Sequence, residues 1–406
     1  MEHASSSGPT KSVSPALTFE VLATQGRARA SRMTLPHFTA ETPMFMPVGT
    51  QGTVKGLTSQ QLVDLDCHVI LGNTYHLENR PGSDIVAQMG GLHGFIGWPR
   101  GMLTDSGGFQ MVSLLHLANI TEEGVQFASP VDGSMMMLTP EHSMAIQNKL
   151  GADIIMALDD VVSSINTSPE RFEEATHRTT RWIDRCIKAH AQPTEQSLFG
   201  IVQGGLNRDL RHTSIRQLSE RNLPGYAIGG LAGGEDKSQF WRVVAQCTAP
   251  GPGLPFNKPR YVMGIGYPLD IVICSALGAD MYDSVYPSRT ARFGVALVPS
   301  GVLKLKNICY REDFRPLDES CGCMTCKKVT RAYLHNLVGK GIPFAAVLMT
   351  YHNIAYTQRL TKQIREAITE QRFPAFVRDF VHKHYPKGDI PIWVIESLTE
   401  VGIDVR

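Results

Sequence analysis

The chain has 406 residues, of which 42% are hydrophobic, and its formal net charge is +1. This length is sufficient for one large domain with an extensive core. The near-neutral charge excludes a global basic field, so a nucleic acid would have to bind through a local patch. No run of 18 apolar residues occurs, so we expect no membrane span.

The N-terminal segment and the cysteines both bear on the cellular setting. Residues 1–15, MEHASSSGPTKSVSP, are small and polar and lack the apolar centre of a signal peptide, so we expect a disordered tail. Three of the eight cysteines crowd together, at Cys321, Cys323 and Cys326. A secreted disulfide scaffold would be smaller and more evenly cross-linked, so this pattern favours a reducing compartment and one metal site.

Short apolar runs with helical patterns between them recur along the chain. Their continuous apolarity is typical of strands buried on both faces, as in a parallel sheet. The eight runs are Met44–Val48, Val69–Leu71, Met102–Leu103, Ile154–Leu158, Leu198–Val202, Tyr226–Ile228, Tyr261–Met263 and Met281–Tyr282. Eight strands alternating with helices predict an α/β fold, a (β/α)8 barrel. A doubly wound open sheet is the alternative, but no glycine-rich dinucleotide fingerprint follows the first strand.

The predicted barrel occupies residues 16–293 and carries two insertions. Between the third and fourth strands, Asp132-Gly133 separates two apolar segments, which predicts an inserted hairpin over about 111–138. A second insertion, 294–352, contains the cysteine cluster. Residues 353–406 carry helical patterns, and we expect these helices to pack on the barrel.

The carboxyl ends of the predicted strands hold polar residues and many glycines. Barrel enzymes place their chemistry at this end, and three of the eight runs are followed by aspartate: Asp105, Asp159-Asp160 and Asp283. Two carboxylates suit substitution at a sugar carbon, one as nucleophile and one moving protons. Asp105 and Asp283 are the candidates for this pair. Gln203 follows another strand and suits the edge of a base or an amide.

Basic residues and the cysteine cluster follow the last strand. Arg289 and Arg292, with Lys304–Asn307 and Cys326–Arg331, form a basic strip that would suit a polyanion. The spacing C-x-C-x-x-C predicts a tetrahedral zinc site with a fourth ligand from Cys309, His335 or His352. Such a closed site would be structural. An iron–sulfur cluster is the alternative, although no fourth cysteine lies nearby.

The motifs TDSGGFQ, LDD, QGG, IGGLAGGE, MGIGYP, DSVYPSRTARFG and CGCMTC with a distant HN resemble those of the tRNA-guanine transglycosylases. The resemblance extends from about Phe19 to about Phe380, with the motifs in the family's order. It implies a (β/α)8 barrel with a zinc-binding subdomain. It also implies exchange of guanine at the anticodon wobble position of certain tRNAs for a 7-deazaguanine.

The resemblance implies a role for each matching residue. Asp283 would be the nucleophile that attacks ribose C1′ and forms a covalent tRNA–enzyme intermediate, and Asp105 would transfer the proton. The implied base-binding residues are Asp105, Ser106, Gly107, Gly108, Phe109, Asp159, Gln203, Gly230 and Met263, with Phe109 and Met263 sandwiching the base. The anticodon loop would lie on Gly264, Ile265, Gly266, Tyr267, Pro268, Leu269 and Asp270 and on Ser288, Arg289, Thr290, Ala291 and Arg292. The implied zinc ligands are Cys321, Cys323, Cys326 and His352.

Two positions resemble the eukaryotic catalytic subunits of this family. Val161 stands where bacterial sequences have cysteine, and Gly233 replaces a bulkier valine, which would make room for the cyclopentenediol arm of queuine. The implied substrates are queuine and the tRNAs for aspartate, asparagine, histidine and tyrosine. The implied partner is a non-catalytic paralogous subunit, with which the chain would form a heterodimer. The implied location is the cytoplasm, with peripheral association with the mitochondrial outer membrane as a variant.

Two rival functions remain at this point. A retaining glycoside hydrolase also uses two carboxylates in a barrel, but the zinc insertion and the pair Arg289 and Arg292 argue against it. A non-catalytic zinc-containing tRNA-binding subunit is the second rival, but such paralogues lose the catalytic aspartates, whereas this chain retains Asp105 and Asp283.

Overall fold

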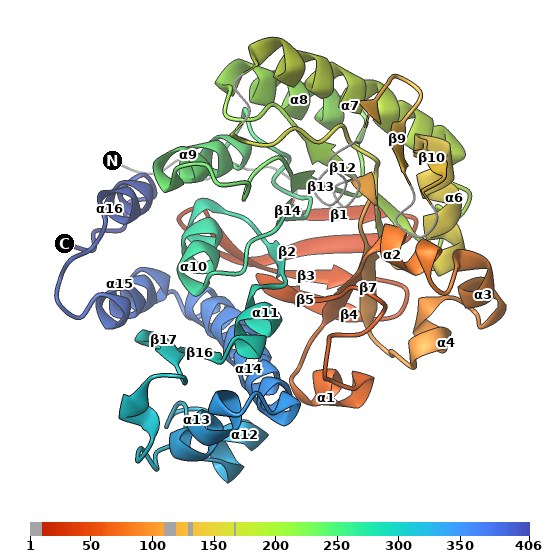
Figure 1. Cartoon of the computed structure of the whole chain (residues 1–406). Coiled ribbons are helices and arrows are strands. Elements are labelled where there is room, and N and C mark those ends of the chain that lie inside the picture. Colours follow the sequence, from red (N-terminus) through yellow and green to blue (C-terminus); the bar gives the residue numbers. More distant parts are fainter. Residues whose placement is uncertain (1–9, 109–118, 129–132, 166–167) are drawn as a thin grey trace.

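The computed structural model describes residues 10–108, 119–128, 133–165 and 168–406. Eight parallel strands form a closed barrel in the order β5-β6-β7-β11-β12-β13-β14-β15, closed by pairing of β15 with β5. The strands are Met44–Gly49, Val69–Gly72, Gly101–Thr104, Ile154–Met156, Ser197–Val202, Gly225–Ile228, Arg260–Val262 and Met281–Ser284. Each of the eight apolar runs supplies one of them, and the (β/α)8 prediction is confirmed (Figure 1).

Helices surround the barrel and bury one face against it. In α7 (Pro169–Ala189), Ser168 caps the first turn and Thr179, Trp182 and Cys186 face inward, as their helical spacing predicts. Among the described residues, the other helices between barrel strands are α1 (Ser59–Asp64), α2 (Thr74–Asn79), α3 (Ser83–Gln88), α4 (Leu92–Ile96), α6 (Pro140–Leu150), α8 (Arg208–Glu220), α9 (Lys237–Cys247) and α10 (Pro268–Leu277).

An antiparallel sheet precedes the barrel and covers its amino-terminal end. It is built from β1 (Lys11–Ser14), β2 (Leu17–Gln25), β3 (Ala28–Thr34) and β4 (Thr39–Thr42), in that order. Phe19 and Met33 of the sheet share a buried cluster with barrel residues such as Met281. This corrects two expectations. Residues 16–43 are not part of the barrel, and 11–14 are not disordered, because β1 pairs with β2 along its full length.

The segment after β7 forms a second small sheet, here called the inserted sheet. Its strands are β8 (Asn119–Ile120), β9 (Val125–Ala128) and β10 (Met135–Leu138). They pair antiparallel, with Met135 opposite Ala128, so the β9–β10 pair matches the expected hairpin. Asp132 of the expected turn lies outside the described residues.

The metal-cluster segment is inserted between the last barrel strand and the last barrel helix. It contains α11 (Tyr286–Arg292), β16 (Val295–Val298), β17 (Gly301–Lys304), the 3-10 helix η1 (Ile308–Tyr310), α12 (Met324–Lys328) and α13 (Arg331–Gly339). The chain then returns in α14 (Pro343–Thr369), which packs on β5 and beside α11 (Figure 1). The expected boundary at 352/353 therefore falls inside one helix. The reason is that α14 both contributes to the cluster and completes the barrel.

Two shorter helices, α15 (Phe373–His384) and α16 (Ile392–Thr399), follow α14, and α16 packs against α9 and α10. Among the described residues, no helix has both the length and the hydropathy that crossing a bilayer requires.

Candidate active site

Asp105 directly follows strand β7 and is held on both carboxylate oxygens. The backbone N–H groups of Thr74 (2.9 Å) and Gly107 (3.1 Å) donate to Oδ1, and the Asn73 side-chain amide donates to Oδ2. The Thr74 hydroxyl also donates to the Asp105 carbonyl oxygen at 2.5 Å. The loop after β6 therefore fixes this carboxylate at the barrel mouth. Asn73 and Thr74 were not predicted as site residues, although only Gly72 separates them from an apolar run.

Asp283 lies at the end of β15 and is held differently. Its Oδ1 accepts hydrogen bonds from the Tyr261 hydroxyl (2.5 Å) and from the Gly264 backbone N–H (2.8 Å). No described residue donates a hydrogen bond to Oδ2. Loss of hydration raises the pKa of Asp283, and the negative charge of Asp105 contributes to the rise. The two carboxylates therefore lie close enough for the charge of one to influence the other, and Asp283 keeps one oxygen without a described donor.

The third carboxylate at the mouth, Asp159, lies one strand further along. It is buried, and accepts hydrogen bonds from the Gln203 amide (2.7 Å) and the Ser106 hydroxyl (3.2 Å). Burial raises the pKa of Asp159 to about 6, despite these two hydrogen bonds. The structure thus brings together Asp159, Gln203 and Ser106, which the sequence placed on three separate strand ends.

Glycines let the backbone approach the space between these side chains. Gly107 and Gly230 have φ of +83° and +67°, a region that other residues rarely adopt. A Cβ on Gly230 would lie 2.5 Å from the Gln203 side-chain oxygen. The partly buried Met263 lies beside this loop, because its sulfur is 3.5 Å from the position of a Cβ on Gly229. Gly108 also borders the site, whereas Phe109 lies outside the described residues.

A buried arginine fixes two neighbouring strand ends. Arg211 of α8 donates to the carbonyl oxygens of Val202, Gly205 and Gly229, each at 2.8 Å. Because these carbonyls flank Gln203 and Gly230, one guanidinium sets the spacing of two base-binding candidates. Sequence reasoning missed Arg211, since nothing in an isolated helical arginine indicates that it is buried.

The Glu235 carboxylate holds the loop around Gly233 in place through hydrogen bonds. The backbone N–H groups of Ala232 (2.7 Å) and Gly233 (2.9 Å) donate to the Glu235 carboxylate, as does the Ser164 hydroxyl (2.7 Å). A Cβ on Gly233 would lie 2.6 Å from the Ser164 hydroxyl oxygen. A valine at this position would therefore displace the Ser164 side chain. Val161, which precedes Ser164 in the same loop, is also buried.

The two expected RNA-binding segments are only partly accessible. Gly264, Tyr267, Arg289 and Arg292 are exposed, and Thr290 is half-buried. The buried members are Ile265, Gly266, Pro268, Leu269, Asp270, Ser288 and Ala291. Asp270 pairs with Lys237, and the Tyr267 ring packs on Tyr286 at 4.1 Å. The buried residues shape this rim, and the exposed ones are available for contact.

The expected metal ligands converge. The donor atoms of Cys321, Cys323, Cys326 and His352 all lie within 4.8 Å of one another. His352 Nδ1 is 3.7 Å from the sulfur of Cys323 and 3.3 Å from that of Cys326. His352 Nε2 is 2.8 Å from the Leu297 carbonyl oxygen, a contact that assigns the proton to Nε2 and leaves Nδ1 free to bind a metal.

The geometry chooses among the ligands that the sequence left open. His335 is engaged with the Leu305 carbonyl oxygen (2.7 Å), and Cys309 is exposed and outside the cluster. Three sulfurs and one imidazole fit a tetrahedral metal ion, and this cluster could hold one.

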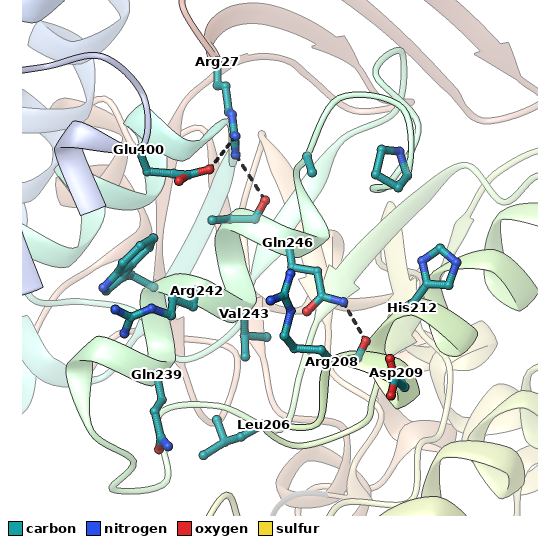
Figure 2. A pocket seen from close by; sticks show the side chains of 14 residues that line it. Arg27, Leu206, Arg208, Asp209, His212, Gln239, Arg242, Val243, Gln246 and Glu400 are labelled. Atoms are coloured by element: carbon teal, nitrogen blue, oxygen red, sulfur yellow. Dashed lines mark hydrogen bonds and ion pairs between the residues drawn. The ribbon is translucent and has the colours of Figure 1, made fainter. Parts of the chain in front are cut away.

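A large cavity among the described residues lies elsewhere. It measures about 860 Å³ and lies between α8 and α9, where Arg27 pairs with Glu400 (Figure 2). None of the candidate catalytic or base-binding residues lines it. The chemistry of the carboxylates, rather than the size of a cavity, therefore marks the candidate site.

Comparisons with known proteins agree with this geometry. The sequence model of the family described as queuine tRNA-ribosyltransferase matches residues 24–386. The chain is 50% identical over 402 residues to the queuine tRNA-ribosyltransferase catalytic subunit of Schizosaccharomyces pombe, covering 96% of this chain and 98% of that protein. It is 47% identical to the catalytic subunit of Caenorhabditis elegans, over 95% of this chain and 99% of that protein. It is 48% identical to the queuine tRNA-ribosyltransferase of Thermus thermophilus, over 95% and 98%.

Proposed function

Since the chain belongs to the queuine tRNA-ribosyltransferase family, we propose that it exchanges guanine for queuine at the wobble position of tRNA by double displacement at ribose C1′. One observation carries the assignment of roles. Asp283 Oδ2 receives no hydrogen bond from a described residue, whereas both oxygens of Asp105 are engaged. A carboxylate with a free oxygen suits the nucleophile, and a carboxylate in a hydrogen-bond network suits proton transfer.

In the first displacement, Asp283 Oδ2 forms a bond to C1′ while the bond from C1′ to guanine N9 breaks. Guanine leaves with a proton supplied by Asp105. In the second displacement, Asp105 takes the N9 proton of queuine, N9 attacks C1′, and the ester bond to Asp283 breaks. Two inversions retain the configuration at C1′. The Tyr261 hydroxyl and the Gly264 N–H stabilise the carboxylate that each cycle regenerates.

The base would lie against Asp159, Gln203 and Gly230, with Met263 on one face. In the free protein Gln203 and Ser106 satisfy the Asp159 carboxylate. A base carrying N–H donors would replace those partners, which keeps the buried charge hydrogen-bonded throughout. Phe109 would cover the other face. Gly233 would accommodate the arm of queuine.

The cluster of Cys321, Cys323, Cys326 and His352 would hold one structural zinc ion. Four protein ligands would fill a tetrahedral coordination sphere and leave no position for a substrate. The ion would tie α12 to α14, and α14 packs on the barrel. The exposed Tyr267, Arg289 and Arg292 would contact the anticodon stem-loop.

The remaining proposals concern the setting. The substrate tRNAs would be those for aspartate, asparagine, histidine and tyrosine, and the location would be the cytoplasm or the outer face of mitochondria. The partner would be a non-catalytic paralogous subunit. Apolar side chains on the metal-cluster segment support a partner, since Ile308 and Phe314 are 72% and 75% exposed.

The test is incorporation of labelled queuine and of its smaller bacterial precursor into tRNA, with and without the partner subunit. We expect queuine to be preferred, and a covalent tRNA adduct to survive a denaturing gel in the wild type but not in Asp283→Ala. Tight tRNA binding without adduct or incorporation, with or without the partner subunit, would identify a non-catalytic subunit instead.

A further inference from the structure

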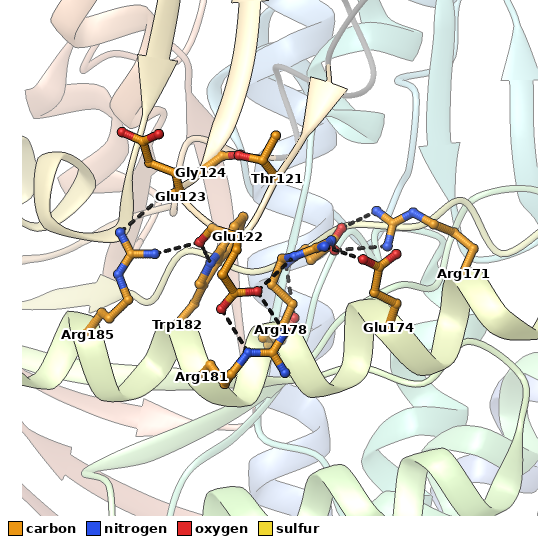
Figure 3. A network of polar contacts seen from close by, with 12 residues as sticks. Thr121, Glu122, Glu123, Gly124, Arg171, Glu174, Arg178, Arg181, Trp182 and Arg185 are labelled. Atoms are coloured by element: carbon orange, nitrogen blue, oxygen red, sulfur yellow. Dashed lines mark hydrogen bonds and ion pairs between the residues drawn. The ribbon is translucent and has the colours of Figure 1, made fainter.

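The inserted sheet is anchored to α7 through one turn, Thr121–Gly124, which joins β8 to β9 (Figure 3). The Glu122 carboxylate accepts hydrogen bonds from Arg181 at 2.8 and 2.7 Å. The Glu122 carbonyl oxygen accepts from the Trp182 indole (2.9 Å) and from Arg185 (2.8 Å). Four contacts on one residue fix this end of the sheet to the outer helix.

The same helix holds the loop that carries Asp159. Residues 157–163 have no regular secondary structure, so other groups must fix their path. The fully buried carboxylate of Asp160 pairs with Arg171 (2.9 Å) and Arg178 (2.6 Å) of α7. The Asp160 N–H donates to the Thr179 hydroxyl at 3.0 Å. Asp160 is thereby fixed from the outside, one peptide bond from the base-binding Asp159.

Arg178 contacts both Asp160 and Glu122. Its Nη1 binds Asp160, while its Nε forms an ion pair with Glu122 at 3.5 Å, and the side chain is only 7% exposed. The far edge of the inserted sheet also reaches the site, because Leu138 packs where a Cβ on Gly107 would lie, at 3.3 Å. The sheet therefore contacts one base-binding loop directly, through Leu138, and is joined to the loop of Asp159 indirectly, through Arg178.

We propose that Arg178 is a positioning residue for base recognition, which fixes the loop of Asp159 through Asp160 and couples that loop to the inserted sheet. This inference rests on the proposed function, in which Asp159 binds the base. It predicts that loss of Arg178 weakens base binding more than it slows the displacement steps.

The chain offers a matched control. Arg181 lies on the same helix and also pairs with Glu122, but it makes no contact with Asp160. In Arg178→Met, we expect the KM for guanine to rise about tenfold, since a charge-assisted hydrogen bond to a buried carboxylate is lost, with kcat changed by less than about threefold. In Arg181→Met, we expect both constants to stay within about twofold of wild type. Arg178→Lys should recover most of the loss, because an ammonium can still reach Asp160.

Two outcomes separate failure of this inference from failure of the proposed function. Hydrogen exchange over residues 157–163 needs no turnover, and it should accelerate in Arg178→Met but not in Arg181→Met. Equal exchange in the two variants, or a lowered melting temperature with an unchanged KM, would overturn the positioning role. A wild type that incorporates no guanine, with exchange as expected, would overturn the proposed function alone.

Discussion

Strand β11 has an aspartate just before it and another just after it, and the fold uses the two carboxyl groups in opposite ways. At the amino-terminal end, Asp153 accepts from the backbone N–H groups of His37 (3.1 Å) and Met102 (2.8 Å) and pairs with the rings of His37 and His93. These partners outweigh burial and lower its pKa to about 2. At the carboxyl end, Asp159 has two neutral donors, and burial raises its pKa to about 6.

Strand β15 repeats the contrast. Asp280, just before the strand, is fully buried and receives hydrogen bonds from Arg29 (2.8 Å) and from the Arg260 backbone N–H (2.7 Å). Asp283, the third residue of the strand, has one oxygen with no described donor and a raised pKa. Burial alone therefore does not distinguish a structural aspartate from a chemical one. The charge of the side-chain donors does, because Asp153 and Asp280 pair with histidine or arginine whereas Asp159 and Asp283 have neutral donors.

The largest expected effect is at β15, where Asp283→Ala should lower guanine incorporation by roughly 10,000-fold, because no other group can form the ester bond. The melting temperature should stay near that of wild type. The matched variant, Asp280→Asn, should lower stability and leave activity intact. It leaves the buried Arg29 charge without a carboxylate partner and should cost about 3 kcal/mol of unfolding free energy, with kcat unchanged per folded molecule. Substantial incorporation by Asp283→Ala would break the comparison.

A substitution of Asp105 examines a carboxylate at the barrel mouth that accepts hydrogen bonds on both oxygens. Asp105→Asn retains an acceptor for the backbone N–H groups of Thr74 and Gly107 but cannot carry the proton, so incorporation should fall by roughly 100- to 10,000-fold. The initial labelled-guanine rate in saturating tRNA measures this effect. A rate within about twofold of wild type would place the proton transfer on another group.

The barrel was predictable because its strands are buried on both faces, which leaves short continuous apolar runs in the sequence. The sheet of β1–β4 was not, since its strands alternate polar and apolar residues, and β1 reads as a polar tail without its partner. The sequence also did not show that α14 is the last helix of the barrel, because the long metal-cluster segment separates it from the last barrel strand. Contact across the barrel, not local pattern, determines both features.

The candidate site was also predictable only in part. Aspartates after apolar runs marked Asp105, Asp159 and Asp283, but the sequence left open which of two would be the nucleophile. Their different donors, from loops distant in sequence, separate the roles. Arg178 and Arg211 escaped detection because a buried arginine and an exposed one look alike in a helical pattern.

Asp159 should destabilise the fold at neutral pH. Its pKa is about 6 in the folded protein against 3.8 as the ordinary value, so its contribution is favourable below pH 4 and is lost as the pH rises to about 6. Asp159→Asn should therefore raise the unfolding free energy at pH 7.5 by up to about 3 kcal/mol while weakening base binding. Urea titrations at several pH values measure the difference, which should vanish near pH 4. A variant less stable than wild type at pH 7.5 would contradict this.

Asp153 should contribute to the unfolding free energy at neutral pH with the opposite sign to Asp159, and by a smaller amount. Its folded pKa of about 2 lies below the ordinary 3.8, so its stabilisation is complete above about pH 4 and is lost as the pH falls toward 2. Asp153→Asn should lower the unfolding free energy at pH 7.5 by about 2 kcal/mol, with guanine incorporation per folded molecule unchanged. The same urea titrations should show the deficit closing between about pH 4 and pH 2, where the wild-type carboxylate is itself protonated. A fall in base affinity in this variant would mean that the two ends of β11 are coupled, and that the aspartates at the amino-terminal end contribute to substrate binding as well as to stability.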